Sequence, residues 1–262
     1  MMQLYRRIQK ALALRRYGAH SWKYYALALN YQYPDKVRLQ GGELVLSAFN
    51  LSLPVGKYSF ILQAYSHALL LAEKLKAQFQ LRDQTMEVAF QGLKFEVQTA
   101  EDLFILREIY LEGTYNYILP DTGRPVVVID IGMNVAFASV YFSRIKKASR
   151  VISFEPFKPT FLQALRHLEL NQVGGSVKPN NFGLGESDKK LEVDYAPAQR
   201  GQVGIWGTKL VFAGVQEQQK ESILIKSAAR VFAEIEQDHP EAVFVLKVDC
   251  EGAEYEILPA LS

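Results

Sequence analysis

Two acidic residues stand directly after apolar runs of the sequence, where buried strands would end. Asp130 follows Val126–Ile129, and Glu155 follows Val151–Phe154. Four successive β-branched residues before Asp130 are typical of a central parallel strand that is covered on both faces. Open α/β sheets bind ligands at the carboxyl ends of such strands, so we expect the two acids to lie in one ligand site.

The turn after the first strand has a composition that suits a ligand. Gly132 lacks a Cβ, so its backbone can adopt unusual dihedral angles or approach a bound molecule closely. A carboxylate such as Glu155 can accept hydrogen bonds from both hydroxyls of a ribose. We therefore expect a nucleoside site formed by Asp130, Gly132, Asn134, Glu155 and Pro156. For the turn taken alone, the alternative is an ordinary strand-to-helix turn with an incidental aspartate.

Two kinds of cofactor compete for a nucleoside site of this composition. A dinucleotide site needs glycines at G-x-G-x-x-G spacing, so that the backbone can meet a pyrophosphate. This chain has Gly132, Asn134 and Ala136 instead, and Asp130 would repel a phosphate. S-adenosylmethionine has no phosphate and carries positive charge at its sulfur and its amine. Charge therefore favours S-adenosylmethionine.

A second group of charged residues stands at the end of the apolar run 243–248. It contains Lys247, Asp249, Glu251 and Glu254. We expect Asp249 to hold the substrate or to receive a proton from an acceptor hydroxyl, with Lys247 fixing that carboxylate. We expect Glu251 and Glu254 to face the acceptor, although an acidic start of a helix also explains Glu254. No histidine stands near these acids, so no metal site is predicted.

The strands and helices that would position these residues alternate along the chain. From residue 126 onward strand and helix patterns alternate, which indicates a doubly wound, mainly parallel sheet. We predict strands at 126–130, 151–154, 177–182 and 243–248, helices at 135–144, 158–170 and 227–237, a turn at 183–185, and two antiparallel strands at 191–195 and 222–226.

The residues before this alternation predict an N-terminal α+β extension. We predict hairpins within 36–55 and 85–98, the second with Gly92 at its turn, and one long helix over Tyr58–Leu81. A capping box at Thr99 and Asp102 opens a helix over Leu103–Leu111, which Gly113 ends. We therefore place an extension at 1–98 and the S-adenosylmethionine-binding domain at 99–262.

The first residues are locally basic. Apolar side chains recur at helical spacing over residues 3–17, which predicts a basic amphipathic helix. Such a helix can make weak peripheral contact with an anionic membrane or bind a partner, or it can pack on its own domain with a solvated basic face.

The composition of the chain limits the classes of protein to which it can belong. The chain has 262 residues, of which 49% are hydrophobic and 22% charged, as in ordinary globular proteins. A net charge of +2 excludes no class of partner, and we expect no nucleic acid. One cysteine excludes a disulfide framework and a cysteine-based zinc site. No apolar run reaches the ~18 residues of a membrane span and no secretory signal is present, so a cytoplasmic location is predicted.

Four motifs, DIGMN, ISFEP, HLELN and LKVDCEGAEYEIL, occur in this order, with EDLFILREIYLEGTYNY upstream. Over about residues 97–258 the sequence resembles the FkbM-type S-adenosylmethionine-dependent methyltransferases. The resemblance implies a class I methyltransferase fold, which is Rossmann-like, and O-methylation of a hydroxyl on a sugar, glycan or other small molecule. It implies a cofactor turn at Asp130, Gly132 and Asn134, a ribose-binding Glu155, and a K-x-D-x-E-G-A-E motif at Lys247, Asp249, Glu251, Gly252 and Glu254. We also expect Tyr115 to face the acceptor.

Two departures from the family pattern stand out. Ala136 occupies a position where the family usually has a second glycine. The sequence also ends at Ser262, whereas a class I sheet continues with a fifth parallel strand and an antiparallel pair. We therefore expect the C-terminal strands to be missing: either the sequence is a fragment, or a homodimer partner or the N-terminal part covers the open edge.

Two other functions stay open on the sequence. One is a non-catalytic module that binds S-adenosylmethionine or a nucleotide, or mediates interactions, after C-terminal truncation. The other is an oxidoreductase that uses a dinucleotide.

Overall fold

The computed structural model divides into two compact units, Met1–Leu111 and Glu112–Ser262, which we describe separately. The helix after the capping box falls in the first unit, whereas the boundary expected from the sequence precedes it. The basic helix predicted at 3–17 lies outside the described residues. The structure describes residues 36–40, 43–54, 57–58, 60–83, 85–116, 122–146, 148–195, 203–204, 207–208, 219–250 and 252–261.

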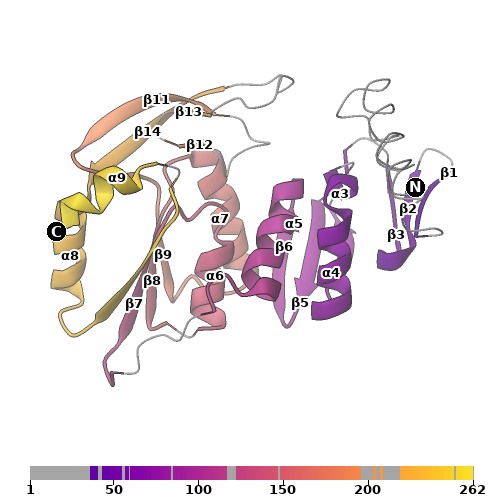
Figure 1. Cartoon of the computed structure of the whole chain (residues 1–262), viewed down its shortest axis with the longest axis horizontal. Coiled ribbons are helices and arrows are strands. Elements are labelled where there is room, and N and C mark those ends of the chain that lie inside the picture. Colours follow the sequence, from indigo (N-terminus) through magenta and orange to yellow (C-terminus); the bar gives the residue numbers. More distant parts are fainter. Residues whose placement is uncertain are drawn as a thin grey trace, which may run out of the picture. The chain divides into compact units, whose positions relative to one another are not determined.

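The described residues of the first unit form two antiparallel sheets (Figure 1). In the first, β1 (Val37–Gln40) and β2 (Glu43–Leu46) form the hairpin predicted within 36–55, and β3 (Leu51–Pro54) adds a third strand. In the second, the hairpin predicted at 85–98 is confirmed as β5 (Thr85–Phe90) and β6 (Leu93–Val97). Its two turn residues, Gln91 and Gly92, both have positive φ, as a tight hairpin turn requires.

The single helix predicted over Tyr58–Leu81 is wrong. The structure has a short α3 (Phe60–Gln63) and then α4 (Tyr65–Leu75). Lys76 adopts a left-handed conformation that ends α4, and β4 (Gln78–Arg82) follows and pairs with β5. The strand forms because Phe79 is buried on the apolar face of this sheet, opposite Val88.

The predicted capping box is confirmed. Asp102 N donates to Thr99 Oγ1, and the Asp102 carboxylate accepts from Thr99 N. These bonds open α5 (Ala100–Arg107), which continues as one π-helical turn, η2 (Glu108–Glu112), before Gly113 at φ 74°.

The second unit is built on a four-stranded parallel sheet in the order β15-β7-β8-β9. The strands are β7 (Val126–Ile131), β8 (Arg150–Phe154), β9 (Val177–Asn180) and β15 (Val243–Val248), and they confirm the parallel strands predicted from the sequence. Figure 1 shows α6 (Phe137–Arg144) and α7 (Lys158–Leu170) on one side of the sheet and α8 (Ala228–Asp238) on the other. This doubly wound arrangement is Rossmann-like.

A core lies between the sheet and α8. Side chains from alternate positions of β7, Val127, Ile129 and Ile131, pack in one buried cluster with Val231 and Ile235 of α8. The other face of β7 is also buried, which explains why every residue of this strand except Asp130 is apolar.

Between β9 and α8 the chain forms a smaller sheet. The two predicted antiparallel strands are confirmed as β11 (Lys189–Tyr195) and β14 (Gln219–Ser227). The predicted turn at 183–185 is instead a short strand, β10 (Gly183–Gly185), parallel to β14. The Ile225 side chain packs closely on Gly183, where a Cβ would lie 2.7 Å from Ile225 Cδ1. A two-residue ladder joins β12 (Val203–Gly204) and β13 (Gly207–Thr208).

The last described elements are α9 (Glu254–Ile257) and the 3₁₀ turn η4 (Pro259–Leu261). β15 occupies one end of the parallel sheet order, with Leu246 exposed. In the part of the chain that the structure describes, no helix has the length and apolar character to cross a membrane.

Candidate functional site

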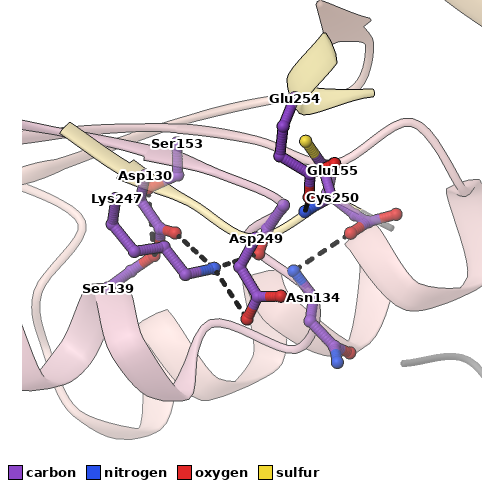
Figure 2. Close-up of polar contacts among 10 residues, drawn as sticks. Asp130, Asn134, Ser139, Ser153, Glu155, Lys247, Asp249, Cys250 and Glu254 are labelled. Atoms are coloured by element: carbon purple, nitrogen blue, oxygen red, sulfur yellow. Dashed lines mark hydrogen bonds and ion pairs between the residues drawn. The ribbon is translucent and has the colours of Figure 1, made fainter. Parts of the chain in front are cut away.

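The carboxyl ends of β7, β8 and β15 bring the predicted site residues into one region (Figure 2). The strand register places Asp130 beside Ser153 of β8 and beside Lys247 of β15. Asn134 and Glu155 lie in the turns that follow these strands. Residues far apart in the sequence therefore share one edge of the sheet, as the sequence predicts.

Asp130 is completely buried and its carboxylate is engaged by protein groups. Its Oδ2 accepts a hydrogen bond from Ser139 Oγ at 2.5 Å, and Oδ1 lies 3.1 Å from Lys247 Nζ. Ser139 Oγ in turn lies 2.9 Å from Ser153 Oγ. The charge of Asp130 is thus matched inside the protein, and these contacts give no support to the expectation that it faces a cationic ligand.

Lys247 is the buried cation that matches this charge. Its Nζ donates to the Gly132 carbonyl at 2.6 Å, and it lies 3.8 Å from Asp249 Oδ2. Burial lowers the pKa of Lys247, but the charges of Asp130, Tyr115 and Asp249 outweigh burial, and the pKa lies above its ordinary value. The amine therefore stays protonated, which excludes it as a general base at neutral pH.

Tyr115, predicted to face the acceptor, lies near enough to Lys247 to act on its pKa. Its ring packs at 5.5 Å from the ring of Phe142 on α6. Tyr115 is half-buried at this edge of the second unit.

The turn after β7 is in direct contact with the turn after β15. Gly132 has φ 81°, and a Cβ at this position would lie 1.9 Å from the backbone oxygen of Asp249. Asp249 N donates to Ile131 O at 3.1 Å, which fixes the same approach. Glycine at 132 is therefore required by the contact between the two turns as well as by its positive φ.

Glu155 is buried and joins the β7 turn to the β8 turn. Its Oε2 accepts from Asn134 N at 3.0 Å and its Oε1 from Phe157 N at 2.9 Å. Burial raises the pKa of Glu155 to about 7, although these backbone N–H groups and Lys247 favour the charged form. Each carboxylate oxygen has about two acceptor sites, so each retains capacity for one hydroxyl. Pro156, half-buried next to it, accepts from Asn181 Nδ2 at 3.2 Å.

The β7 turn also holds a buried acceptor without a donor. Among the described residues, no group donates to Asn134 Oδ1, which is inaccessible to solvent. Buried polar atoms in native proteins nearly always have a partner, so this atom points to a donor supplied by a ligand. Asn134 and Ala136 both adopt left-handed φ, 50° and 66°. Glycine adopts such conformations most readily, so both residues hold a costly backbone conformation in this turn.

The β15 turn presents one exposed acid and one that shapes the backbone. The Asp249 side chain is 64% exposed. Glu254 accepts from Cys250 N at 3.0 Å and from Gly252 N at 2.7 Å. Burial raises the pKa of Glu254, but these backbone hydrogen bonds outweigh it and the pKa is lowered. Glu254 therefore organises the turn and the start of α9, while Glu251 lies outside the described residues.

The thiol next to Asp249 is inert as a nucleophile. Burial, followed by the charge of Glu254, raises the pKa of Cys250 to about 12. A protonated thiol is a poor nucleophile, so the chemistry at this edge rests on carboxylates.

Three residues that support the site are not predicted from the sequence. Ser139 and Ser153 hold Asp130, and His167 of α7 places Nδ1 2.7 Å from the Val135 carbonyl in the β7 turn. A signal for Ser153 was present, since it is a polar residue inside an apolar strand. His167 begins the HLELN motif, but that motif gives no indication of its partner.

A family model and two curated relatives identify the chain as similar to methyltransferases. The family model of the Methyltransferase FkbM domain matches residues 130–261. Methyltransferase 1 of Beauveria bassiana is 27% identical over 206 residues, covering 74% of this chain and 77% of that protein. Methyltransferase sdnD of Sordaria araneosa is 28% identical over 184 residues, covering 63% and 70%.

Among solved structures, the chain is similar to the methyltransferase FkbM of Methylobacillus flagellatus, with a TM-score of 0.30 and 15% identity. The match covers 76% of this chain and 44% of that one, so the chain spans less than half the length of that structure.

Proposed function

The chain belongs to the FkbM methyltransferase domain family, and we propose that it is an S-adenosylmethionine-dependent O-methyltransferase that acts on a hydroxyl of a sugar, glycan or other small molecule. The observation that carries the proposal is Glu155. This buried carboxylate ends β8 beside the β7 turn, and both of its oxygens retain acceptor capacity. A ribose with two adjacent hydroxyl donors matches that pair of oxygens.

The residues of the β7 turn fit the proposed cofactor. Asn134 Oδ1 is a buried acceptor that needs a donor, and the ammonium group of S-adenosylmethionine is a strong donor. Because Asp130 is neutralised by Lys247, the acid of this site that remains available to a cationic cofactor is Glu155. When bound, S-adenosylmethionine supplies a methyl group on a positively charged sulfur that a hydroxyl oxygen can attack.

Asp249 is the proposed group for the acceptor. Its exposed carboxylate stands in the β15 turn, in contact with the β7 turn through Gly132. There it accepts a hydrogen bond from the acceptor hydroxyl, orients the oxygen, and takes the proton as the oxygen becomes methylated. Most of the acceleration then comes from holding two reactants in the right geometry. Lys247, which stays protonated, cannot take that proton.

Calorimetric titration with S-adenosylmethionine and S-adenosylhomocysteine tests the cofactor. At about pH 8, above the pKa of about 7 that burial gives Glu155, we expect Glu155→Ala to weaken binding at least tenfold, since it removes hydrogen bonds to a charged acceptor worth about 1.5–3 kcal/mol each. Glu234→Ala is the matched control, because Glu234 is an exposed acid of α8. Failure of the intact chain to bind either compound would overturn the proposal.

A panel of hydroxyl-bearing acceptors tests the reaction. We expect Asp249→Ala to keep cofactor binding and lose turnover, with Asp238→Ala at the exposed end of α8 as the control. Unchanged turnover in Asp249→Ala removes the role assigned to that residue. Cofactor binding without transfer to any acceptor would favour the non-catalytic module.

A further inference from the structure

Lys247 lies between the β7 turn and the β15 turn, with contacts to both (Figure 2). We infer that Lys247 is a positioning residue for the cofactor turn, because its buried ammonium holds the Gly132 carbonyl and so fixes the turn that presents Asn134 N to Glu155. This inference rests on the proposed function, since it takes the β7 turn as the place where S-adenosylmethionine binds.

The distances from Lys247 Nζ show which of its partners it contacts most closely. Its Nζ donates a hydrogen bond to Gly132 O at 2.6 Å and forms an ion pair with Asp130 Oδ1 at 3.1 Å. Asp249 Oδ2 is 3.8 Å away, beyond hydrogen-bond range, on a side chain exposed to solvent that screens the pair. The amine therefore acts mainly on the first turn, whereas the sequence predicts that it fixes Asp249.

The β7 turn needs such a clamp because its backbone conformation is costly. Asn134 and Ala136 occupy the left-handed region, which non-glycine residues rarely adopt, and Gly132 can adopt many conformations. On the β8 side, Gly132 N and Met133 N both donate to Phe154 O, at 3.1 and 2.9 Å. Lys247 holds the Gly132 carbonyl from the β15 side. The peptide groups of the turn are then fixed from both neighbouring strands.

Hydrogen bonds continue from this clamp to the proposed ribose acceptor. Lys247 Nζ holds Gly132 O, and two residues later Asn134 N donates to Glu155 Oε2 at 3.0 Å. A change in the orientation of the Gly132 peptide would move Asn134 N away from Glu155. Lys247 thus acts on Glu155 through the turn, without contact to the cofactor.

The supporting network keeps Lys247 charged in a buried place. Asp130 supplies the counter-charge, and Ser139 holds Asp130 with a 2.5 Å hydrogen bond. Buried ion pairs can often be exchanged for uncharged groups of similar volume without loss of stability, whereas removal of one partner is strongly destabilising. Stability and positioning can therefore be separated by mutation.

Three variants of the full chain make that separation: Lys247→Met, the uncharged pair Asp130→Asn/Lys247→Met, and Asp249→Asn. Urea unfolding and calorimetry with S-adenosylmethionine are measured on each. We expect Lys247→Met to be destabilised and the pair to recover most of the unfolding midpoint. The pair should still bind S-adenosylmethionine about tenfold to a hundredfold more weakly, because Gly132 O has lost a charged donor. Asp249→Asn should bind it like the unmodified chain.

The outcomes distinguish this inference from the proposed function. If the unmodified chain binds S-adenosylmethionine and the folded pair binds it equally well, the positioning role is wrong and the proposed function stands. If the unmodified chain does not bind it, the proposed function fails. Should the pair not fold, Ser139→Ala gives a milder test, with binding expected to weaken about threefold through Asp130. Undiminished affinity in a folded Ser139→Ala would overturn the inference.

Discussion

The β7 turn, residues 130–136, and the β15 turn, residues 247–254, start from the same ingredients and use them in opposite ways. Each has an aspartate at the end of a parallel strand and a glycine with positive φ. Asp130 is completely buried against Lys247 and Ser139, whereas the Asp249 side chain is 64% exposed. An acid at a strand end is therefore available to a ligand only when the fold has not already matched its charge.

The glycines of the two turns differ in the same way. Gly132 is where the turns touch, so its missing Cβ serves the packing of one turn on the other. Gly252, at φ 102°, lies in a turn that Glu254 shapes through its hydrogen bonds to backbone N–H groups. The β7 turn is thus held from outside by neighbouring strands, and the β15 turn is held by its own side chain.

The largest expected effect comes from forcing the two turns apart. In Gly132→Ala the new Cβ would lie 1.9 Å from Asp249 O, in addition to an unfavourable φ of 81°. We expect a loss of about 4 kcal/mol or more in the free energy of unfolding, measured in urea. Gly123→Ala is the control: Gly123 has φ 68° and nothing within 4 Å, so only backbone strain of about 1–2 kcal/mol applies. Equal losses would show that the turns are not in the contact described.

A slightly smaller loss of stability should distinguish Asp130 from Asp249. Asp130→Asn removes the counter-charge of buried Lys247, and breaking a buried pair in this way costs about 3–5 kcal/mol. Asp249→Asn changes an exposed side chain and should alter stability by no more than about 0.5 kcal/mol. Urea unfolding of both variants at pH 7 checks the difference. Similar losses of stability in the two variants would show that the charge of Asp130 is no more tightly paired in the fold than that of Asp249.

The sequence was informative about the fold where patterns were long and strong. The β-branched run of β7 and the capping box of α5 each allow one interpretation, and both are confirmed. The segment around Phe79 is different, because Leu75 and Phe79 fit a helical repeat while Phe79 and Leu81 fit an alternating one. Pairing with β5 decides between them, and local periodicity does not contain that information.

The candidate site shows the same limit. The sequence identifies Asp130 and Asp249 as acids at strand ends, because that depends only on local pattern. It does not reveal that Lys247 stands beside Asp130, since this depends on the register between β15 and β7, strands separated by more than a hundred residues. The register between β7 and β8, which places Ser153 beside Asp130, is equally hidden from the local pattern.

The smallest expected effect is on the pH dependence of stability, to which Glu155 and Glu254 should contribute with opposite signs. Burial raises the pKa of Glu155 from 4.5 to about 7, so between these values the folded chain binds more protons than the unfolded chain. Stability should then fall by up to about 3 kcal/mol as the pH rises through this window. Glu254 in the β15 turn has a lowered pKa, so its contribution is present above pH 4.5 and is lost as the pH falls through the lowered value. Urea unfolding from pH 4 to 8 should show the first decline in the unmodified chain and not in Glu155→Gln, while Glu254→Gln should retain it. If stability still declines between these pH values in Glu155→Gln, a group other than Glu155 causes the decline. The expected contrast in pH dependence between Glu155 and Glu254 would then be wrong.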